Sequence, residues 1–346
     1  MRHRYVTAIA LVATAIVVGY VFYSATSAPS SAMVYQGDFN LERPPVATSS
    51  RVHLTGDVFL GRDVERTMLT RGDDYPLQLF DELPSADAIV INFESAIPQT
   101  HVPTPDMGMR FSVRAVVASA LHDAGVTHAG LANNHTYDHG ASGYRHTRAV
   151  LREAGVAPFG HPSQIDSDVS VAKIKTSHAD IAIVGMHTLY GQPSLYSIAQ
   201  VYEEVAPTVD IVLAYVHWGE EYEVRHGYTQ RRFAEQLVEQ GFDIIIGHHP
   251  HVVQGIEMID GVPVVYSLGN TVFDQYFSTE VQRGLVATLH VSPTERALQL
   301  RPITSIDSRV RPRLMGESDA DHFLDLVAAR GQPELAEMVR QGWIVW

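Results

Sequence analysis

Short apolar runs rich in β-branched residues recur along the chain and predict buried strands. Over the first three quarters of the chain they cover residues 51–54, 88–93, 126–131, 169–174, 180–184, 210–216 and 242–246. Stretches with helical periodicity lie between them, at residues 113–124, 142–154 and 229–240. Each of these is followed by a glycine, the residue that commonly ends a helix. Strands that alternate with helices predict an α/β fold.

After Pro250 the pattern changes to closely spaced strands, at residues 252–258, 262–266, 284–291 and 297–303. Asp260-Gly261 is typical of a hairpin turn between the first two of them. This change predicts a mixed sheet or a second sheet layer. Residues 318–341 have the pattern of one or two amphipathic helices. We therefore expect one domain over residues 50–310, with a helical extension over residues 311–346 that packs on it.

The N-terminus predicts a membrane segment. Residues 5–23 form 19 positions without a formal charge, and Arg2 and Arg4 precede them. A helix of that length spans about 28 Å, close to the hydrocarbon thickness, and the positive-inside rule places the body outside the cytoplasm. We expect a transmembrane signal anchor within residues 1–30 and a flexible linker over residues 31–49. The alternative is a signal peptide cleaved near Ser27 or Ala32, which would give a secreted body.

Composition narrows the classes of function. The chain has 25 Lys and Arg against 39 Asp and Glu, a formal net charge of −14. This charge argues against a nucleic-acid partner, and an anionic substrate must be attracted locally. Cysteine is absent, which excludes disulfides, thiolate metal sites and cysteine catalysis. Histidine, in contrast, occurs 18 times.

Polar residues that could carry chemistry follow directly after the predicted strands. They are Asp57, Glu94, Asn133, Asn134, His135, His217, His248, His249 and His251. Since the carboxyl ends of neighbouring strands share one crevice in open α/β sheets, we expect five separate segments to converge on one site.

Carboxylate, amide and imidazole donors without sulfur suit a hard or borderline ion such as Mn²⁺, Fe²⁺, Zn²⁺ or Mg²⁺. Two ions bridged by Glu94 would clamp the attacking and leaving oxygens of a phosphoryl displacement. His249 and His251 are the strongest pair, because an extended backbone places both imidazoles on one side. Lone histidines are better explained as surface or core residues, and no role is assigned to His53, His161 or His290.

An ordered series of motifs spans about residues 50–280. It consists of Gly56-Asp57, Asn92-Phe93-Glu94, Leu131-Ala132-Asn133-Asn134-His135 with Asp138 and Gly140, His217-Trp218-Gly219 with Glu221-Tyr222, Gly247-His248-His249-Pro250-His251-Val252 with Gln254, and Tyr266-Ser267-Leu268-Gly269-Asn270 with Phe273-Asp274-Gln275. This series resembles the capsule synthesis protein CapA family, which is associated with poly-γ-glutamate capsules and is itself similar to calcineurin-like metallophosphoesterases. The resemblance implies a four-layer α/β/β/α sandwich, here preceded by the N-terminal transmembrane helix.

The resemblance also implies roles for individual residues. The ligands of one ion would be Asp57, Glu94 and His251, and those of the other Glu94, Asn134, His217 and His249. His135 would donate a proton to the leaving group, and Asp138 would orient the His135 ring.

Two positions depart from the metallophosphoesterase pattern. Phe59 stands where those enzymes usually carry a His two residues after the first Asp, and Glu94 stands where they usually carry an Asp. The first metal site is therefore a ligand short. It binds weakly, takes a ligand from elsewhere or stays empty, so the expected cofactor is one or two divalent ions.

The leading hypothesis is an exported, membrane-anchored, metal-dependent hydrolase of a phosphoester or related anionic linkage, involved in the synthesis or export of a poly-γ-glutamate type of capsule polymer. Arg62 and Arg110 are candidates to hold substrate oxygens, although a solvated surface role fits each of them equally well. The alternative is a non-catalytic polyanion-binding subunit that works with other capsule synthesis and export subunits. A weaker interpretation is a nucleotide or nucleic-acid phosphoesterase, which no glycine-rich phosphate loop or basic aromatic stripe supports.

Overall fold

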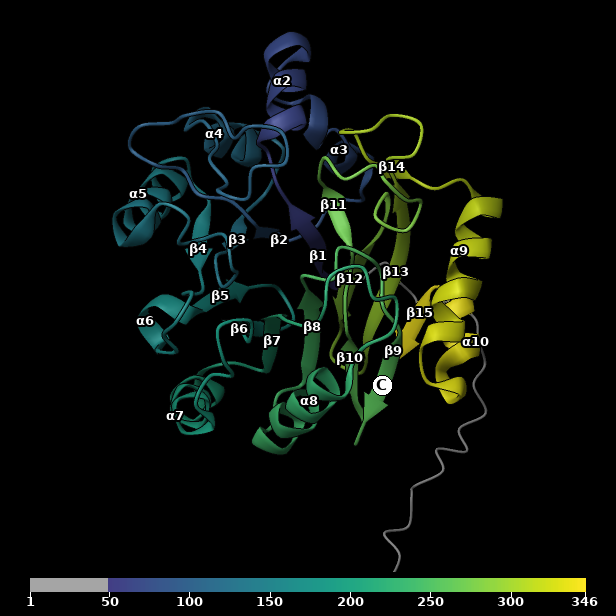
Figure 1. Ribbon diagram of the computed structural model, residues 1–346. Helices are drawn as coiled ribbons and strands as arrows, with labels where there is room; N and C mark the ends of the chain where they lie inside the picture. Colours follow the sequence, from purple (N-terminus) through teal and green to yellow (C-terminus); the bar gives the residue numbers. More distant parts are fainter. Residues whose placement is uncertain (1–48) are drawn as a thin grey trace, which may run out of the picture. The chain divides into compact units, whose positions relative to one another are not determined.

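Two β-sheets carry the fold of residues 49–346, the part of the chain that the computed structural model describes (Figure 1). The strands of the first sheet are β1 (Ser50–Val58), β2 (Ala88–Phe93), β3 (His128–Gly130), β4 (Ala157–Phe159), β11 (Asn270–Val272), β12 (Arg283–Val291), β13 (Arg296–Thr304), β14 (Arg313–Leu314) and β15 (Trp343–Val345). Its main path runs β14-β13-β12-β1-β2-β3-β4, with β11 beside β1 and β15 beside β13. The half from β1 to β4 is parallel, and the half from β12 onward is antiparallel.

The second sheet has six strands in the order β5-β6-β7-β8-β10-β9. They are β5 (Val171–Lys175), β6 (Asp180–His187), β7 (Ile211–His217), β8 (Ile244–His248), β9 (Ile256–Ile259) and β10 (Val262–Val265). Strands β6, β7, β8 and β10 are parallel, and the two edge strands pair antiparallel. Each sheet therefore contains a parallel block whose carboxyl ends can contribute to a site.

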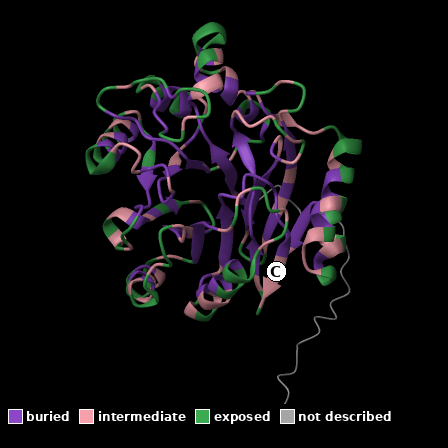
Figure 2. Ribbon diagram, in the orientation of Figure 1, coloured by how far each residue is buried: buried purple, intermediate pink, exposed green. Residues whose placement is uncertain are grey.

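Helices cover the outer faces of the two sheets. They are α2 (Arg62–Arg71), α3 (Leu79–Glu82), α4 (Val116–Asp123), α5 (Gly140–Glu153), α6 (Ser167–Ser170), α7 (Leu195–Val205), α8 (Tyr228–Gln240), α9 (Glu317–Arg330) and α10 (Ala336–Arg340), with short 3₁₀ turns η2 (Tyr75–Leu77), η3 (Ala206–Thr208) and η4 (Pro333–Leu335). The amphipathic helices bury one side and expose the other, as the mixed colours of the helices in Figure 2 show.

Three apolar clusters define the layers. The first joins side chains from both sheets, such as Leu54 of β1 and Leu213 of β7, and helices α9 and α10 close it at one side with Phe323 and Val339. The second lies between the first sheet and helices α2 to α5, and the third lies between the second sheet and helices α7 and α8. The order of layers is therefore helix, sheet, sheet, helix.

The expected α/β architecture is confirmed, and the hairpin at Asp260-Gly261 joins the antiparallel strands β9 and β10. Both turn residues have positive φ angles, 47° and 84°, as a two-residue hairpin of this type requires. Strand β1 is longer than expected because Asp57 and Val58 still pair with β2 and β11. The expected strand at residues 252–258 begins only at Ile256, since the preceding residues form the loop after β8.

The C-terminal segment forms α9 and α10 and also adds β14 and β15 to the first sheet. All described residues belong to one unit by their contacts. The expectations for an anchor within residues 1–30 and a linker over residues 31–49 concern, apart from residue 49, positions outside the described residues. Among residues 49–346 no helix combines the length and the apolar character needed to span a bilayer.

Candidate metal centre

Side chains from both sheets meet where the parallel strands end. Asp57 lies near the end of β1 and Glu94 directly follows β2 in the first sheet. His217 ends β7, and His249 and His251 follow β8 in the second sheet. All five are buried, with at most 6% of the surface of any residue exposed. The strand ends thus bring together residues that are far apart in the chain.

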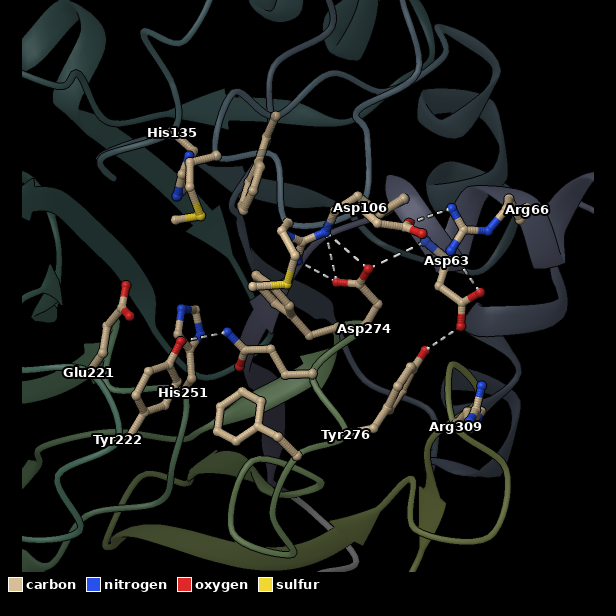
Figure 3. A pocket seen from close by; sticks show the side chains of 17 residues that line it. Asp63, Arg66, Asp106, His135, Glu221, Tyr222, His251, Asp274, Tyr276 and Arg309 are labelled. Atoms are coloured by element: carbon tan, nitrogen blue, oxygen red, sulfur yellow. Dashed lines mark hydrogen bonds and ion pairs between the residues drawn. The ribbon is translucent and has the colours of Figure 1, made fainter.

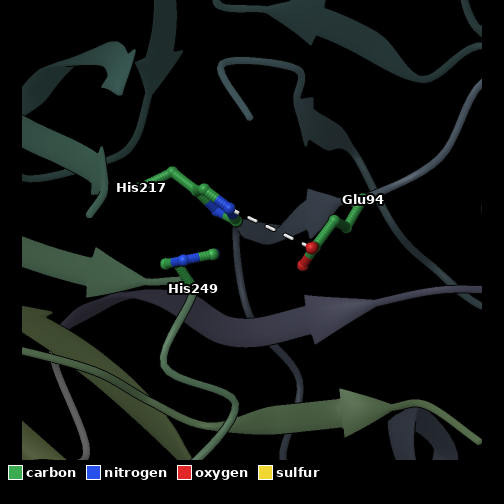
Figure 4. Close-up of side chains that lie close together, drawn as sticks. All are labelled: Glu94, His217 and His249. Carbon is green, nitrogen blue, oxygen red and sulfur yellow. Dashed lines mark ion pairs between the residues drawn. The ribbon is translucent and has the colours of Figure 1, made fainter. Parts of the chain in front are cut away.

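The ligand atoms of these residues form overlapping groups. In each group the atoms lie within 4.8 Å of one another. The groups are Glu94 with His217 and His249, Asp57 with Glu94 and His251, and Glu221 with His249 and His251. Figure 4 shows the side chains of the first group pointing toward one another. Glu94 belongs to two groups, which is the arrangement a bridging carboxylate needs.

Glu94 is the clearest indication of a cation site. Its side chain is fully buried, and neither carboxylate oxygen has a hydrogen-bond partner among the described residues. The nearest imidazole nitrogens, Nε2 of His135, His217 and His251, lie between 3.8 and 4.0 Å from Oε1. Burial raises the pKa of Glu94 well above its usual value. A buried carboxylate without partners lowers the stability of the folded protein, because its charge has lost its hydration. A divalent ion between these groups would compensate for this loss and fits the residues present.

His249 supports the same conclusion from the opposite side of the cluster. Its Nδ1 atom is buried without a hydrogen-bond partner among the described residues. Burial, followed by the nearby His251, lowers the pKa of His249 to about 3, so the neutral imidazole keeps a free lone pair at physiological pH. The backbone φ angles of His249 and His251 are 97° and 58°. Such positive values are uncommon outside glycine and occur often at functional sites.

Asp57 and His251 form a hydrogen-bonded pair. Nδ1 of His251 lies 3.1 Å from Oδ2 of Asp57 and 3.0 Å from Oδ1 of Asn270. Burial alone would lower the pKa of His251, but the charge of Glu94 and the bond to Asp57 raise it to about 9. Burial raises the pKa of Asp57, and this effect is outweighed by His251, His248 and Asn92, so the pKa is lowered. The carboxylates of Asp57 and Glu94 therefore stabilise a positive charge beside them, whether a protonated imidazole or a bound cation.

Two amides complete the polar network. The Asn92 side chain donates to Oδ1 of Asp57 at 2.7 Å and lies 3.1 Å from Nδ1 of His217. The Asn134 carboxamide Oδ1 lies 2.9 Å from Nε2 of His217. Asn134 therefore contacts His217 of the group formed by Glu94, His217 and His249, and its role as a ligand stays a prediction.

His135 and Asp138 lie at the edge of the cluster. Nδ1 of His135 lies 2.8 Å from Oδ2 of Asp138, which also accepts the backbone N–H of Phe111. The His135 ring stacks on Phe111 with ring centres 3.7 Å apart. Nε2 of His135 lies 3.9 Å from Oε1 of Glu94. The contact with Asp138 and the stacking on Phe111 together fix the orientation of the ring.

Phe59 cannot serve as a ligand. Its ring is fully buried in the apolar cluster beneath α2. It stacks on Phe111 with ring centres 4.1 Å apart, and the Phe273 ring centre lies 5.2 Å away.

Gly56 allows β1 to approach the turn at Gly269. A Cβ atom at position 56 would lie 1.9 Å from the Gly269 carbonyl oxygen, so only glycine fits there. This close approach aligns Asp57 with Asn270.

The two arginines expected to hold substrate both have partners within the protein. Arg62 forms a fork with Asp274, and its side chain is only 10% exposed. Its guanidinium also lies over Phe59 and Phe111. Arg110 is exposed and donates from Nε to the Asp138 carbonyl oxygen at 2.7 Å. Arg110 therefore supports the loop that carries Asp138.

A cleft of about 390 Å³ leads from the cluster to the surface. Figure 3 shows His135, His251, Glu221 and Tyr222 at one end and Asp63, Arg66, Tyr276 and Arg309 at the other. The charged residues of its lining are Arg62, Arg66, Arg309, Asp63, Asp106, Glu221 and Asp274. The carboxylates offset the three guanidinium groups and the His251 imidazole, so the cleft by itself is not a basic groove.

Several residues of the site were not predicted from the sequence as functional. Asn92 and Asn270 hold Asp57 and His251, and Glu221 joins the ligand groups, although all three stand in the quoted motifs. Their place in the motif series was the available signal, and Asn92 and Glu221 also stand within a few residues of a predicted ligand. His248, left out of the predicted ligand set, is buried beside Asp57 and lacks a hydrogen-bond partner on either ring nitrogen among the described residues. Burial lowers the pKa of His248 to about 4.

Comparison with known proteins gives consistent matches. Residues 51–275 match the model of a family described as the bacterial capsule synthesis protein PGA_cap. The capsule biosynthesis protein CapA of Bacillus anthracis is 29% identical over 254 residues, which cover 67% of this chain and 62% of that protein. The PGA biosynthesis protein CapA of Bacillus subtilis is 28% identical over 267 residues, covering 71% and 70%. The match thus spans less than two thirds of the B. anthracis relative.

Solved structures also match, at low sequence identity. A structure described as a novel phosphatase from Mycoplasma pneumoniae has a TM-score of 0.47 and 13% identity, covering 77% of this chain and 92% of that one. A hypothetical protein from Thermus thermophilus has a TM-score of 0.45 and 14% identity, covering 77% and 98%.

Proposed function

This chain belongs to the family of the bacterial capsule synthesis protein PGA_cap, and on that premise we propose that it is a metal-dependent hydrolase of a phosphoester or related anionic linkage that acts in capsule polymer synthesis or export. The observation that carries the proposal is the fully buried Glu94 carboxylate, to which residues 49–346 give no hydrogen bond and beside which several imidazoles lie. A purely structural site would pair such a charge with donors. The names of the relatives support the link to capsule and poly-γ-glutamate synthesis.

The residues divide into two ligand sets. Asp57, Glu94 and His251 would hold one divalent ion, and Glu94, Asn134, His217 and His249 would hold the other. When bound, such ions supply Lewis-acid polarisation of the scissile linkage and activate water at neutral pH. This arrangement is the one that would be expected if the chain shares the metallophosphoesterase type of four-layer fold.

His135 would act on the leaving group. In its cationic form the Nε2–H group is the proton donor, because Nδ1 is bound to Asp138. The contact of Nδ1 with Asp138 orients the ring, and stacking on Phe111 fixes its plane. The Nε2 atom faces the cluster, so the proton is delivered on the side where the ligand groups lie.

The cleft residues suggest how an anionic substrate enters. Arg309 is exposed, lies over the Tyr276 ring at 5.0 Å and has no carboxylate ion pair among the described residues. Since Arg62 and Arg110 already have partners within the protein, Arg309 is a further candidate contact for substrate oxygens. Because the carboxylates of the lining offset its positive groups, a polyanion would depend on the bound cations for attraction. This balance favours a metal-containing site over attraction of a polyanion by the side chains alone.

Location and partners complete the proposal. Residues 5–23 would anchor the body to the outer face of the cytoplasmic membrane, as the charge pattern of Arg2 and Arg4 favours. Capsule synthesis or export subunits are the partners that such a position would serve. Protease treatment of intact spheroplasts should degrade the body from outside, and full protection would contradict this topology.

The activity is tested with the full-length protein and Mn²⁺ on nitrophenyl phosphate mono- and diesters. We expect metal-dependent turnover that His249→Ala abolishes. His322→Ala serves as the matched control, because His322 is exposed on α9 and absent from the ligand groups. Turnover that survives chelation, or that His249→Ala leaves unchanged, would contradict the proposal.

A further inference from the structure

We propose that Glu221 is a direct ligand of the ion held by Asp57, Glu94 and His251, and that it supplies the ligand missing at Phe59. The proposal rests on the metal centre proposed above. Its basis is that a Glu221 carboxylate oxygen and the ligand nitrogens of His249 and His251 lie within 4.8 Å of one another. Figure 3 shows Glu221 at the same end of the cleft as His251 and His135.

The three side chains of this ion's set leave its coordination incomplete. Hard divalent ions such as Mn²⁺ and Mg²⁺ prefer about six ligands, largely oxygens. Phe59 is packed among other rings and offers no donor atom. A carboxylate that enters from the second sheet is therefore the protein ligand that the site lacks.

The backbone holds Glu221 in place relative to the histidines. Trp218 donates its backbone N–H to the His248 carbonyl oxygen at 3.0 Å, and Tyr222 donates to that of Pro250 at 2.8 Å. Hydrogen bonds at Trp218 and Tyr222, on both sides of Glu221, therefore join the loop after β7 to the segment at the end of β8. The φ angle of Tyr222 is 67°, a left-handed conformation that is uncommon for a residue other than glycine. The loop after β7 thus fixes Glu221 beside His249 and His251.

The charge environment of Glu221 differs from that of the other carboxylates in the cleft. Asp63 and Asp106 both pair with Arg66, and Asp274 pairs with Arg62. Glu221 forms no ion pair with a Lys or Arg among the described residues, although it is partly buried. It is thus the cleft carboxylate whose charge remains available for a cation.

The test is Mn²⁺ binding to the full-length protein. Binding is measured by calorimetry and by the electron paramagnetic resonance signal of the free Mn²⁺ that remains. Glu221→Gln should weaken one of the two sites at least about tenfold and leave the other unchanged. Glu220→Gln is the matched control, since it removes the same charge from an exposed neighbour on the same loop. It should bind as the wild type does.

The outcomes separate this inference from the proposed function. A wild-type protein that binds no Mn²⁺ would overturn both. If the wild type binds Mn²⁺ and Glu221→Gln binds it with the same stoichiometry and affinity, Glu221 is not a ligand, and the metal centre itself stands. A raised KM with unchanged metal binding would assign Glu221 to the substrate and equally overturn the inference. Circular dichroism of each variant establishes that it is folded.

Discussion

Nδ1 of His251 lies 3.1 Å from Oδ2 of Asp57, so a residue of the loop after β8 and a residue of β1 are joined at the boundary of the two sheets. This bond leaves Nε2 of His251 directed toward Glu94, at 3.8 Å from Oε1. The two carboxylates raise the pKa of His251 to about 9 against the effect of burial, so the imidazole carries a proton at neutral pH when no metal competes for it.

A pH dependence of metal binding follows from this relationship. Because a metal ion must displace the His251 proton, Mn²⁺ affinity should rise with pH and level off above about 9. Calorimetry at pH 7.5 in two buffers with different ionisation enthalpies should detect proton release on binding. His248→Gln is the control, since the pKa of His248 is lowered to about 4 and does not titrate in this range. An affinity that is constant from pH 6.5 to 9 would contradict this assignment.

Replacing Glu94 should separate metal binding from folding. We expect the metal-free stability of Glu94→Gln to equal or exceed that of the wild type, because the substitution removes a buried carboxylate that has no hydrogen-bond partner within the described part of the chain. Its stabilisation by Mn²⁺, about 2.7 kcal/mol when the ion is at 100 times its Kd, should be lost. Thermal unfolding with and without Mn²⁺ measures both quantities.

Glu65→Gln is the matched control for that experiment. Glu65 is also buried, but it contacts His101 and Arg114. Its loss should destabilise the protein in both conditions and leave the Mn²⁺ effect intact. A Glu94→Gln variant that Mn²⁺ still stabilises fully would exclude Glu94 as a ligand.

His135 should matter most where the leaving group needs a proton. His135→Ala is expected to lower kcat by about 10²–10⁴-fold on alkyl or phenyl phosphoesters and far less on nitrophenyl esters, whose leaving group departs without protonation. Asp138→Asn should show the same selectivity at a loss of about 10–100-fold. A plot of rate against leaving-group pKa for each variant measures the effect. Equal losses on both substrate types would remove His135 from proton transfer.

Arg62 should prove structural. Arg62→Ala leaves the nearly buried Asp274 carboxylate without its partner, so we expect a loss of about 3–5 kcal/mol in the free energy of unfolding. The exposed pair Arg340–Asp325 provides the comparison, since Arg340→Ala should cost less than about 1 kcal/mol. Urea unfolding measures both. An Arg62→Ala variant of normal stability with a raised KM would instead support the substrate contact expected from the sequence.

The sequence predicted the α/β fold because its strong signals are local. Buried strands such as β7 and β8 are continuous apolar runs, and the glycines after α4, α5 and α8 mark the ends of helices. The rule that strand ends share a crevice indicated where polar residues such as Glu94 and His217 would meet. The short strands β4, β11, β14 and β15 were missed, because two or three residues carry too little pattern to be recognised.

The partners of individual side chains could not be predicted. Asp274 follows β11 and meets Arg62 at the start of α2, a contact that depends on the pairing of β1 with β11 rather than on either local sequence. Glu221 looked like part of a loop motif, and its proximity to His249 comes from backbone hydrogen bonds between two loops. Such contacts are fixed by tertiary structure, which periodicity does not encode.

The central claim is that the buried cluster around Glu94 binds divalent cations. Crystals of the protein grown with Mn²⁺ and measured at the manganese absorption edge test it most directly, since anomalous scattering locates the ion independently of any model of the protein. We expect a peak at about coordination distance, roughly 2.0–2.3 Å, from a Glu94 oxygen and from nitrogens of His217 and His249 or of His251. Anomalous density that is absent from this cluster in a crystal soaked to saturation, or that lies only at surface carboxylates, would contradict the claim.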